Sequence, residues 1–464
     1  MLKFGGTSLG SPKDINSVAR TVASFSKDNE IVVVCSAVDG VTDGLILISK
    51  MIEQRKEDDV VKALDKIIKK HKKLADQTIK SSTIKKQLLE KLSNDVSELQ
   101  ELVRGLTLLK EVSARSLDYL ISFGERFSDD LVSYALQDLK KKSTALNGKE
   151  VGIVTDSNFG ESRPLMDTTR IRISKTLGSL LSKKIIPVVG GFAGADQHGN
   201  ITTFGRGGSD YTATIIASCI NADEIWLMSD VAGLMTADPK LVKNAKLLKE
   251  VSYDEAIEMA LFGAKQIHPR TFEPLLSRKI PMRIRSTFDI KNPGTIVTVS
   301  PSSAIKKTVK CVSAIRNIGL MGISGGIMFA SPGSASMVFS VLAEKKINVI
   351  MVSSNPSEAS ISIVVKKPDL EKAVNALEMN LLGKIIKNIE ITQNASIIAV
   401  IGSGMKGTVG IASKVFSAVQ KRKVNVIMIA QGSSELNLAF VVKDSDCKSV
   451  IESLHKEFRL DKIN

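Results

Sequence analysis

The stretch LKFGGTSLGSPKDINSVARTVASFSKDNEIVVVC, from Leu2 to Cys35, decides the fold. Its last five residues are a continuous, mostly β-branched apolar run, which is typical of a strand buried on both faces. Apolar residues between Ile15 and Phe25 recur at helical spacing, and Ser11 followed by Pro12 is a favourable helix start. The stretch therefore predicts a strand, a glycine turn, a helix and a second strand parallel to the first.

Similar signals continue through the first 300 residues. Apolar runs of strand length lie at 185–189, 224–228 and 280–284, with helical patterns between them, and residues 45–120 are mostly helical and charged. A turn-rich block at 194–200 precedes a short strand pattern, which predicts a hairpin. We expect an α/β fold with an open, mainly parallel sheet flanked by helices.

The last third of the chain repeats itself. VFSVLAEKKINVIMVSS begins at Val338 and VFSAVQKRKVNVIMIAQ begins at Val415, so the offset is 415 − 338 = 77 residues. Each copy has the pattern strand, glycine-rich turn, helix, two strands and helix, which predicts an α+β unit with a small antiparallel sheet. The stretch SPSS at residues 300–303 interrupts the strand and helix patterns, so we place a domain boundary there. The predicted domains are residues 1–300, 308–385 and 386–464.

Composition narrows the class of protein. The chain has 464 residues and 43% hydrophobic residues, and no apolar run approaches the ~20 residues of a membrane span. The first strand begins at residue 2, so we expect no signal peptide. The four cysteines lie far apart and form no metal-type or disulfide-type spacing. We therefore expect a cytoplasmic protein without a membrane partner.

The net charge of +15 raises the question of nucleic acid. Aromatic residues are only 4% and the lysines are spread along the chain, so no stacking platform for bases is visible. The densest basic run, residues 69–73, lies in an amphipathic helical pattern and is predicted to be a solvated face. We expect attraction to small anions instead of nucleic acid.

The turn KFGGTS, at Lys3–Ser8, is a candidate phosphate site. Gly5 and Gly6 would let backbone N–H groups approach phosphate oxygens, and the helix that follows adds positive potential. Lys3 supplies a full charge. The stretch matches neither the P-loop nor the G-x-G-x-x-G pattern, and a tight strand-to-helix connection explains it equally well.

A second glycine-rich stretch, FGRGGSDY at Phe204–Tyr211, precedes a predicted helix at 212–220. Its three glycines can form an anion nest. Arg206 can hold a carboxylate with two parallel hydrogen bonds. A plain loop would not need this combination, so the stretch favours an anionic ligand.

Shorter motifs are ambiguous one by one. Ser36 and Thr42 follow the buried strand, at the edge where open α/β sheets bind ligands, although turn chemistry also explains them. FGER at 123–126 places an acid beside a base after a helical pattern, as a surface ion pair would. The stretches at 229–233, 236–240 and 262–265 can each be a cap or a turn.

Taken in order, KFGGTS, Ser36-Ala37 with Thr42, FGER, GRGGSDY, SDVAG with TADPK, and FGAKQIHPRT resemble the motifs of the aspartate kinases. The doubled tail resembles the paired ACT regulatory domains of the same enzymes. The resemblance covers essentially the whole chain. It implies an amino-acid-kinase domain followed by two ferredoxin-like ACT domains. No homoserine dehydrogenase segment follows residue 464, so a monofunctional enzyme is expected.

The resemblance implies a reaction. The γ-phosphoryl group of ATP would pass to the side-chain carboxylate of L-aspartate, giving 4-phospho-L-aspartate for lysine, threonine and methionine biosynthesis. Both reactants are anions, so the protein must mainly neutralise and align them. Lys3 would stabilise the transferring phosphoryl group, and Asp210 would orient the lysine. No general base is needed, because a carboxylate is already ionised at neutral pH.

The resemblance also implies the binding residues. Arg206 would hold the α-carboxylate of aspartate and Glu125 its α-ammonium, which selects an amino acid over a plain dicarboxylate. Mg²⁺ would be held mainly by the nucleotide phosphates and water, and we predict no protein ligand for it. The other substrate-binding residues would be Ser36, Thr42, Gly207, Gly208 and Ser209. The nucleotide-binding residues would be Lys3, Gly5, Gly6, Ser229, Asp230, Met235, Lys240 and Lys265.

Three of these positions depart from the family's usual residues. Ser229 replaces a threonine, which is a mild change. Met235 stands where tyrosine is usual and cannot stack or donate as tyrosine does. Lys240 replaces an arginine and lacks its bidentate fork. We therefore expect weaker contacts to ATP at the last two positions.

The tail is expected to bind an amino-acid effector, lysine or threonine, and to join subunits into a homodimer or higher homo-oligomer. Residues 431–437 keep the family's common pattern and residues 353–360 depart from it, so either copy can have lost ligand binding. Two alternatives stay open. One is a kinase for glutamate or a nucleotide monophosphate, against which FGER and GRGGSDY argue. The other is an amino-acid sensor without turnover.

Overall fold

The structure is a computed structural model of the chain, and it describes residues 1–263, 267–301, 308–325, 332–355 and 360–462. The chain divides into two compact units. The first contains Met1–Gly233 and Ile267–Ser300, and the second contains Leu234–Gln266 and Pro301–Asn464. Within the described residues, none of the helices combines the length and hydrophobicity that crossing a bilayer requires.

The predicted N-terminal βαβ unit is confirmed. Strand β1 (Leu2–Phe4), helix α1 (Pro12–Phe25) and strand β2 (Val33–Cys35) follow in order, and β1 and β2 pair in parallel. The Ser11 hydroxyl caps α1 by accepting a hydrogen bond of 3.2 Å from the Asp14 N–H. All three residues of β2 are buried, as a strand covered on both faces requires.

The sheet of the first unit extends on both sides of β1. Its parallel strands run in the order β3-β5-β2-β1-β8-β10, and β11 pairs with β10 in the antiparallel direction. The three strands predicted near 185, 224 and 280 are confirmed, each beginning slightly later than expected. The bounds are β3 (Ser143–Leu146), β5 (Ile186–Gly190), β8 (Ile225–Ser229), β10 (Met282–Ser286) and β11 (Thr295–Thr298).

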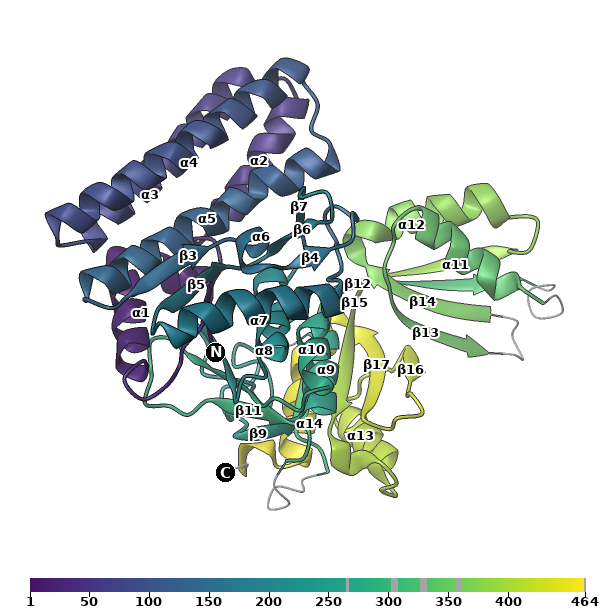
Figure 1. The fold of residues 1–464 in the computed structure, drawn as a ribbon. Helices are drawn as coiled ribbons and strands as arrows, with labels where there is room; N and C mark the ends of the chain where they lie inside the picture. Colours follow the sequence, from purple (N-terminus) through teal and green to yellow (C-terminus); the bar gives the residue numbers. More distant parts are fainter. Residues whose placement is uncertain (264–266, 302–307, 326–331, 356–359, 463–464) are drawn as a thin grey trace. The chain divides into compact units, whose positions relative to one another are not determined.

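Helices cover both faces of this sheet (Figure 1). Helix α5 packs against β3, β5 and α1 on one face, and α3 and α4 lie side by side outside it; α7 and α8 pack together on the other face. The bounds are α2 (Val41–Glu53), α3 (Glu57–Thr78), α4 (Ser82–Leu109), α5 (Ala114–Asp138), α6 (Gly148–Val151), α7 (Met166–Ser182), α8 (Gly208–Cys219) and α10 (Glu273–Leu276).

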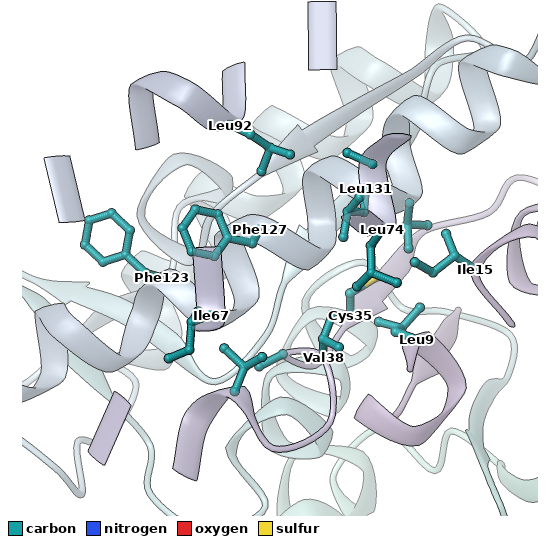
Figure 2. Close-up of a cluster of buried hydrophobic side chains, with 14 of the residues drawn as sticks. Leu9, Ile15, Cys35, Val38, Ile67, Leu74, Leu92, Phe123, Phe127 and Leu131 are labelled. Carbon is teal, nitrogen blue, oxygen red and sulfur yellow. The ribbon is translucent and has the colours of Figure 1, made fainter. Parts of the chain in front are cut away.

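The core under α5 fixes the rotation of that helix. Phe123 and Phe127 are fully buried among side chains of α3 and α4, including Ile67 and Leu92 (Figure 2). Burying each such ring stabilises the fold by about 1.5–3 kcal/mol. Glu125 lies midway between the two phenylalanines in sequence. Because neighbours two apart on a helix face different ways, the phenylalanines anchor one side of α5 and turn Glu125 toward the other.

Two local expectations need correction. FGER does not follow a helix but lies inside α5, because the buried rings on either side of Gly124 continue the helical pattern through it. Helix α8 begins at Gly208, four residues before the predicted start, so Asp210 lies in its first turn.

The predicted hairpin is confirmed as β6 (Ala193–Asp196) with β7 (Ile201–Thr203), and β6 also pairs with β4 (Val154–Thr155).

The second unit contains the predicted antiparallel sheet and both copies of the repeat. Its strands run in the order β13-β14-β12-β15-β17-β16. The bounds are β12 (Cys311–Ser324), α11 (Ser334–Glu344), β13 (Val349–Asn355), β14 (Ser360–Lys366) and α12 (Lys367–Leu381) for the first copy, and β15 (Asn388–Ile401), α13 (Ile411–Gln420), β16 (Met428–Ala430), β17 (Asn437–Lys443) and α14 (Cys447–Glu457) for the second.

The two copies share their central strands. Residues 318–324 of β12 pair with β14 of the first copy, whereas Cys311–Ile315 pair only with β15 of the second. Residues 395–401 of β15 pair in turn with β17. Backbone hydrogen bonds therefore run across the boundary that the sequence places between residues 385 and 386.

The second unit also includes Leu234–Gln266, with β9 (Glu250–Ser252) and α9 (Tyr253–Leu261). Glu255 of α9 is completely buried. Its carboxylate accepts hydrogen bonds from the Lys310 ammonium at 2.8 Å and from the Ser403 N–H and hydroxyl at 2.9 and 2.6 Å. Thr236 Oγ1 lies 2.9 Å from His455 Nε2. Polar contacts thus fasten this segment to the C-terminal tail.

Candidate active site

The carboxyl ends of β1, β2 and β8 lie side by side and bring three predicted motifs to one edge of the sheet. The Gly5 N–H donates to the Met228 carbonyl at 3.2 Å, and the Ser36 N–H donates to the Phe4 carbonyl at 3.0 Å. Ser229 ends β8, directly after Met228. The Gly5 N–H is therefore used within the sheet, so any phosphate at this turn would have to take its hydrogen bonds from other main-chain N–H groups.

Gly6 is required by close packing between two loops. A Cβ atom at Gly6 would lie 2.6 Å from the Ala37 carbonyl oxygen and 3.2 Å from the Asp39 nitrogen. Only glycine lets the turn after β1 approach the turn after β2 so closely. The glycine thus holds the KFGGTS turn against the Ser36–Thr42 segment.

Lys3 and Asp210 form an ion pair at this edge. Lys3 is the middle residue of β1 and is only 8% exposed. Asp210 is placed by the first turn of α8, which follows Gly207 in the left-handed conformation, with φ 71°. A buried ammonium held by one carboxylate keeps further N–H donors for an anionic ligand.

Glu125 approaches the same edge from α5 and is 4% exposed. Its Oε1 accepts a hydrogen bond of 3.1 Å from the Ala37 N–H, while its buried Oε2 has no hydrogen-bond partner within the described part of the chain. Burial raises the pKa of Glu125 to about 8, and the Ala37 N–H, the Lys3 charge and the Ser209 hydroxyl oppose that rise. Once the carboxyl is ionised, the free oxygen can accept a hydrogen bond from a cationic group.

Arg126 is turned away from Glu125. Its guanidinium pairs with Asp95 and Glu98 of α4 at 2.5 and 2.8 Å. The adjacent acid and base of FGER therefore do not form an ion pair with each other. Among the described residues, the Glu125 carboxylate therefore forms no ion pair, although the charge of Lys3 acts on it.

Two glycines near Glu125 pack closely against further residues that are predicted to bind the substrate. A Cβ atom at Gly191 would lie 2.7 Å from the Ser209 Cβ, and one at Gly124 would lie 2.8 Å from the Ala37 Cβ and 3.7 Å from the Thr42 Oγ1. Glu125, Gly190 and Gly191 also line one recess. The structure therefore groups the following predicted residues: Lys3, Gly5, Gly6, Ser36, Thr42, Glu125, Ser209, Asp210 and Ser229.

Other predicted residues are not in this group. Arg206 is exposed, and its side chain makes no hydrogen bond or ion pair with any described residue. The pKa of His268 is lowered mainly by burial and by the charge of Arg270, and the charge of Arg206 adds to this effect. Asp230 is exposed. Met235 and Lys240 belong to the second unit, and Lys265 lies outside the described residues.

Sequence reasoning missed Asp129, which lies one helical turn after Glu125 on α5. A Cβ atom at Gly190 would lie 2.6 Å from the Asp129 Oδ2 and 3.4 Å from the Glu125 Cβ. Burial, and then the charge of Asp130, raise the pKa of Asp129 well above its usual range. The four-residue spacing was the available signal, since it places both acids on one helix face.

Models of known families match both parts of the chain. The amino acid kinase family matches residues 1–286. The ACT domain matches residues 321–381 and again residues 398–458. The two ACT matches are offset by 398 − 321 = 77 residues, which is the offset of the repeat.

Curated relatives match the chain from end to end. Bifunctional aspartokinase/homoserine dehydrogenase 2, chloroplastic, from Zea mays is 33% identical over 472 residues, covering 99% of this chain and 50% of the relative. Aspartokinase 2, chloroplastic, from Arabidopsis thaliana is 31% identical over 475 residues, covering 99% of this chain and 84% of the relative. The chain thus spans about half the length of the bifunctional plant relatives.

Solved structures of Escherichia coli aspartokinase III superpose over nearly the whole chain. The complex with aspartate and ADP matches with a TM-score of 0.83 and 27% identity, covering 98% of each chain. The complex with lysine and aspartate matches with a TM-score of 0.82 and 26% identity, again covering 98% of each chain. Sequence and fold agree: the chain belongs to the amino acid kinase family, among the aspartokinases that carry paired ACT domains.

Proposed function

We propose that this chain is an aspartate kinase, which transfers the γ-phosphoryl group of ATP to the side-chain carboxylate of L-aspartate. One observation carries the proposal. A buried carboxylate with a free oxygen, on Glu125, lies at the same sheet edge as the Lys3–Asp210 ion pair. The first group suits the ammonium of an amino acid, and the second suits the charge of a transferring phosphoryl group.

Glu125 would select the substrate by its charge. The α-ammonium of aspartate would donate to Oε2, while the Ala37 N–H keeps Oε1 oriented. A dicarboxylate without the amine would leave Oε2 buried and unpaired, which is costly. We assign Arg206 to the α-carboxylate, because an exposed guanidinium without a partner among the described residues can form a bidentate pair with it.

Lys3 would stabilise charge on the phosphoryl group in the transition state. Asp210 would hold the ammonium in place, as its ion pair supports. The attacking oxygen belongs to a carboxylate that carries its own negative charge, so no proton has to be removed from it. The chemistry then consists of neutralising and aligning two anions.

The nucleotide is proposed to bind beside Lys3, with Ser229 and Asp230 at the end of β8. Met235 and Lys240 are assigned to it by resemblance alone. A complex of Escherichia coli aspartokinase III is described with ADP, which supports ATP as the donor. Among the described residues no group of three or more His, Cys, Asp or Glu could hold a metal ion. Mg²⁺ is proposed to be held mainly by the nucleotide phosphates and water, which is its usual mode of binding in kinase sites.

The ACT pair is proposed to bind an amino-acid effector, lysine or threonine. The lysine complex of Escherichia coli aspartokinase III supports lysine. We also propose a homodimer or higher homo-oligomer formed through the ACT domains. The proposed location is the cytoplasm, which rests on the sequence pattern alone.

The assay is ADP release by the full chain with MgATP and aspartate, together with trapping of the acyl phosphate by hydroxylamine. We expect a hydroxamate product with aspartate, and little or none with succinate or glutamate. The Glu125→Gln variant should raise KM for aspartate by more than about tenfold, because a neutral amide attracts an ammonium far less. A chain that binds aspartate or lysine and releases no ADP would support the sensor and contradict the kinase.

A further inference from the structure

We propose that Arg270 is a positioning residue that holds the loop Phe204–Tyr211 in the shape that aspartate binding needs. The inference rests on the proposed function, since this loop carries Arg206, Ser209 and Asp210. Arg270 follows His268 and Pro269 in the sequence FGAKQIHPRT. It lies in a short 3-10 helix, Pro269–Phe272, of the first unit.

Arg270 holds the beginning of the loop through main-chain oxygens. Its two terminal nitrogens donate to the Ser162 carbonyl at 3.0 Å and to the Phe204 carbonyl at 3.4 Å. Ser162 is itself paired with the Thr203 carbonyl, through its N–H and its hydroxyl, each at 2.9 Å. The guanidinium therefore ties two neighbouring chain segments at the point where β7 ends and the glycine loop begins.

Arg270 also holds the end of the loop. Its guanidinium carbon lies 4.7 Å from the centre of the Tyr211 ring, within the range of a cation–π contact. Tyr211 meets the Phe204 ring edge to face, with 5.4 Å between ring centres. One arginine thus contacts the residue before Gly205 and the residue after Asp210.

His268 supports the same loop from the neighbouring position. A Cβ atom at Gly207 would lie 2.6 Å from the His268 Cβ, and Gly207 has a positive φ of 71°. A Cβ atom at Gly205 would lie 2.9 Å from the Gly160 carbonyl oxygen. The glycine backbone is therefore packed closely from two sides, and a shift of either support moves it.

The consequence concerns Arg206, whose own side chain has no hydrogen bond or ion pair among the described residues. Its position depends on the backbone around it, which Arg270 fixes at both ends. Lysine cannot replace Arg270 fully, because it lacks the planar fork that reaches two carbonyls and stacks on a ring. Removing Arg270 should therefore misplace Arg206 and Ser209 without removing any group that touches aspartate.

The kinetic test compares Arg270→Ala and Arg270→Lys with Arg278→Ala in the full chain. Arg278 is exposed, and its side chain makes no hydrogen bond or ion pair in the described structure. We expect Arg270→Ala to raise KM for aspartate roughly 10- to 100-fold and to lower kcat, because small misplacements of binding groups are expensive. Arg270→Lys should recover part of the loss, and the control should match the wild type.

A second readout does not depend on activity. Trypsin cleaves after Arg206, so the rate of cleavage at the Arg206–Gly207 bond, followed by mass spectrometry, reports how firmly the loop is held. We expect at least about tenfold faster cleavage there in Arg270→Ala at a temperature where circular dichroism shows both proteins folded. Equal cleavage and equal KM in wild type and variant would overturn the inference. If Arg270→Ala is cleaved faster but the wild-type chain never phosphorylates aspartate, the role of Arg270 in holding the loop stands and the proposed function is refuted.

Discussion

The main-chain N–H of Ala37 donates a 3.1 Å hydrogen bond to one carboxylate oxygen of Glu125, and the other oxygen has no partner in the described chain. The two residues come from the turn after β2 and from the middle of α5. A buried acid that is only half paired costs the fold stability. Such a cost is typical of binding sites, where a ligand supplies the missing partner.

Glu125→Gln should stabilise the folded protein in an alkaline medium. The pKa of Glu125 is raised from its ordinary value of 4.5 to about 8, so the folded state keeps a proton that the unfolded state has lost. Stability therefore falls as the pH rises from about 4.5 to about 8. Glutamine removes this loss. The gain in melting temperature over wild type should be small at pH 5 and larger at pH 8.5.

Glu98→Gln is the matched control with the opposite sign. The pKa of Glu98 is lowered, chiefly by its hydrogen bond from Arg126, so its charge stabilises the fold above its usual pKa and the benefit disappears in acid. The effect is modest because Glu98 is 42% exposed. A fall in melting temperature at pH 8.5 for both variants would contradict the assignment of Glu125.

Binding of aspartate should release protons at neutral pH. Free Glu125 with a pKa of about 8 is mostly protonated at pH 7, whereas a carboxylate facing an ammonium is ionised. Calorimetric titration with aspartate at pH 7 should thus give different heats in phosphate and in Tris, with up to one proton released per site. The number of protons released should fall as the pH rises past about 8. Identical heats in both buffers at pH 7 would rule out this linkage.

Gly191→Ala should damage aspartate use more than stability. The added Cβ would lie 2.7 and 2.9 Å from the Ser209 Cβ and Cα, so the start of α8 has to move. We expect kcat/KM for aspartate to fall at least about tenfold. Gly105→Ala in α4 is the control, because no atom lies within 4 Å of its new Cβ; it should keep wild-type kinetics and gain up to about 1 kcal/mol of stability. Normal kinetics in both variants would refute the packing argument.

Lys310→Met should strongly destabilise the second unit. The Lys310 and Glu255 side chains are only 4% and 1% exposed, and removing one partner of a buried pair costs about 3–5 kcal/mol. Lys421→Met is the control, because it removes an ion pair with Glu457 in which the Lys421 side chain is 62% exposed. It should lower the free energy of unfolding by less than about 1 kcal/mol. Urea unfolding measures both. Adding Glu255→Gln to Lys310→Met should restore part of the lost stability. Equal urea midpoints for Lys310→Met and Lys421→Met would show that the buried pair contributes little.

Much of the fold follows from sequence periodicity. The buried run at β2, the capped helix α1 and the repeat with its offset of 77 residues each have a local physical signal, and each prediction is confirmed. The sharing of β12 and β15 between the two copies has no local signal. It depends on pairing between strands far apart in the chain, which a sequence pattern does not specify.

The site was predictable as a set of residue types and less so as an arrangement. Lys3, Asp210 and Glu125 follow from the motifs, and the structure brings them to one edge. That the Gly5 N–H is used by the sheet depends on the register of β1 against β8. The role of Arg270 was not predictable, because its hydrogen bonds go to the main-chain carbonyls of Ser162 and Phe204. Every residue has a main-chain carbonyl, so no side-chain pattern in the sequence marks these partners.

The most direct test of the central claim is the turnover of Lys3→Met with MgATP and aspartate, compared with Lys13→Met, an exposed lysine on α1. Loss of the charge that stabilises the transferring phosphoryl group should lower kcat by at least about 100-fold, the scale of losing one preorganised electrostatic contact. The control should keep wild-type turnover. A Lys3→Met enzyme that forms aspartyl hydroxamate at the wild-type rate would contradict the account.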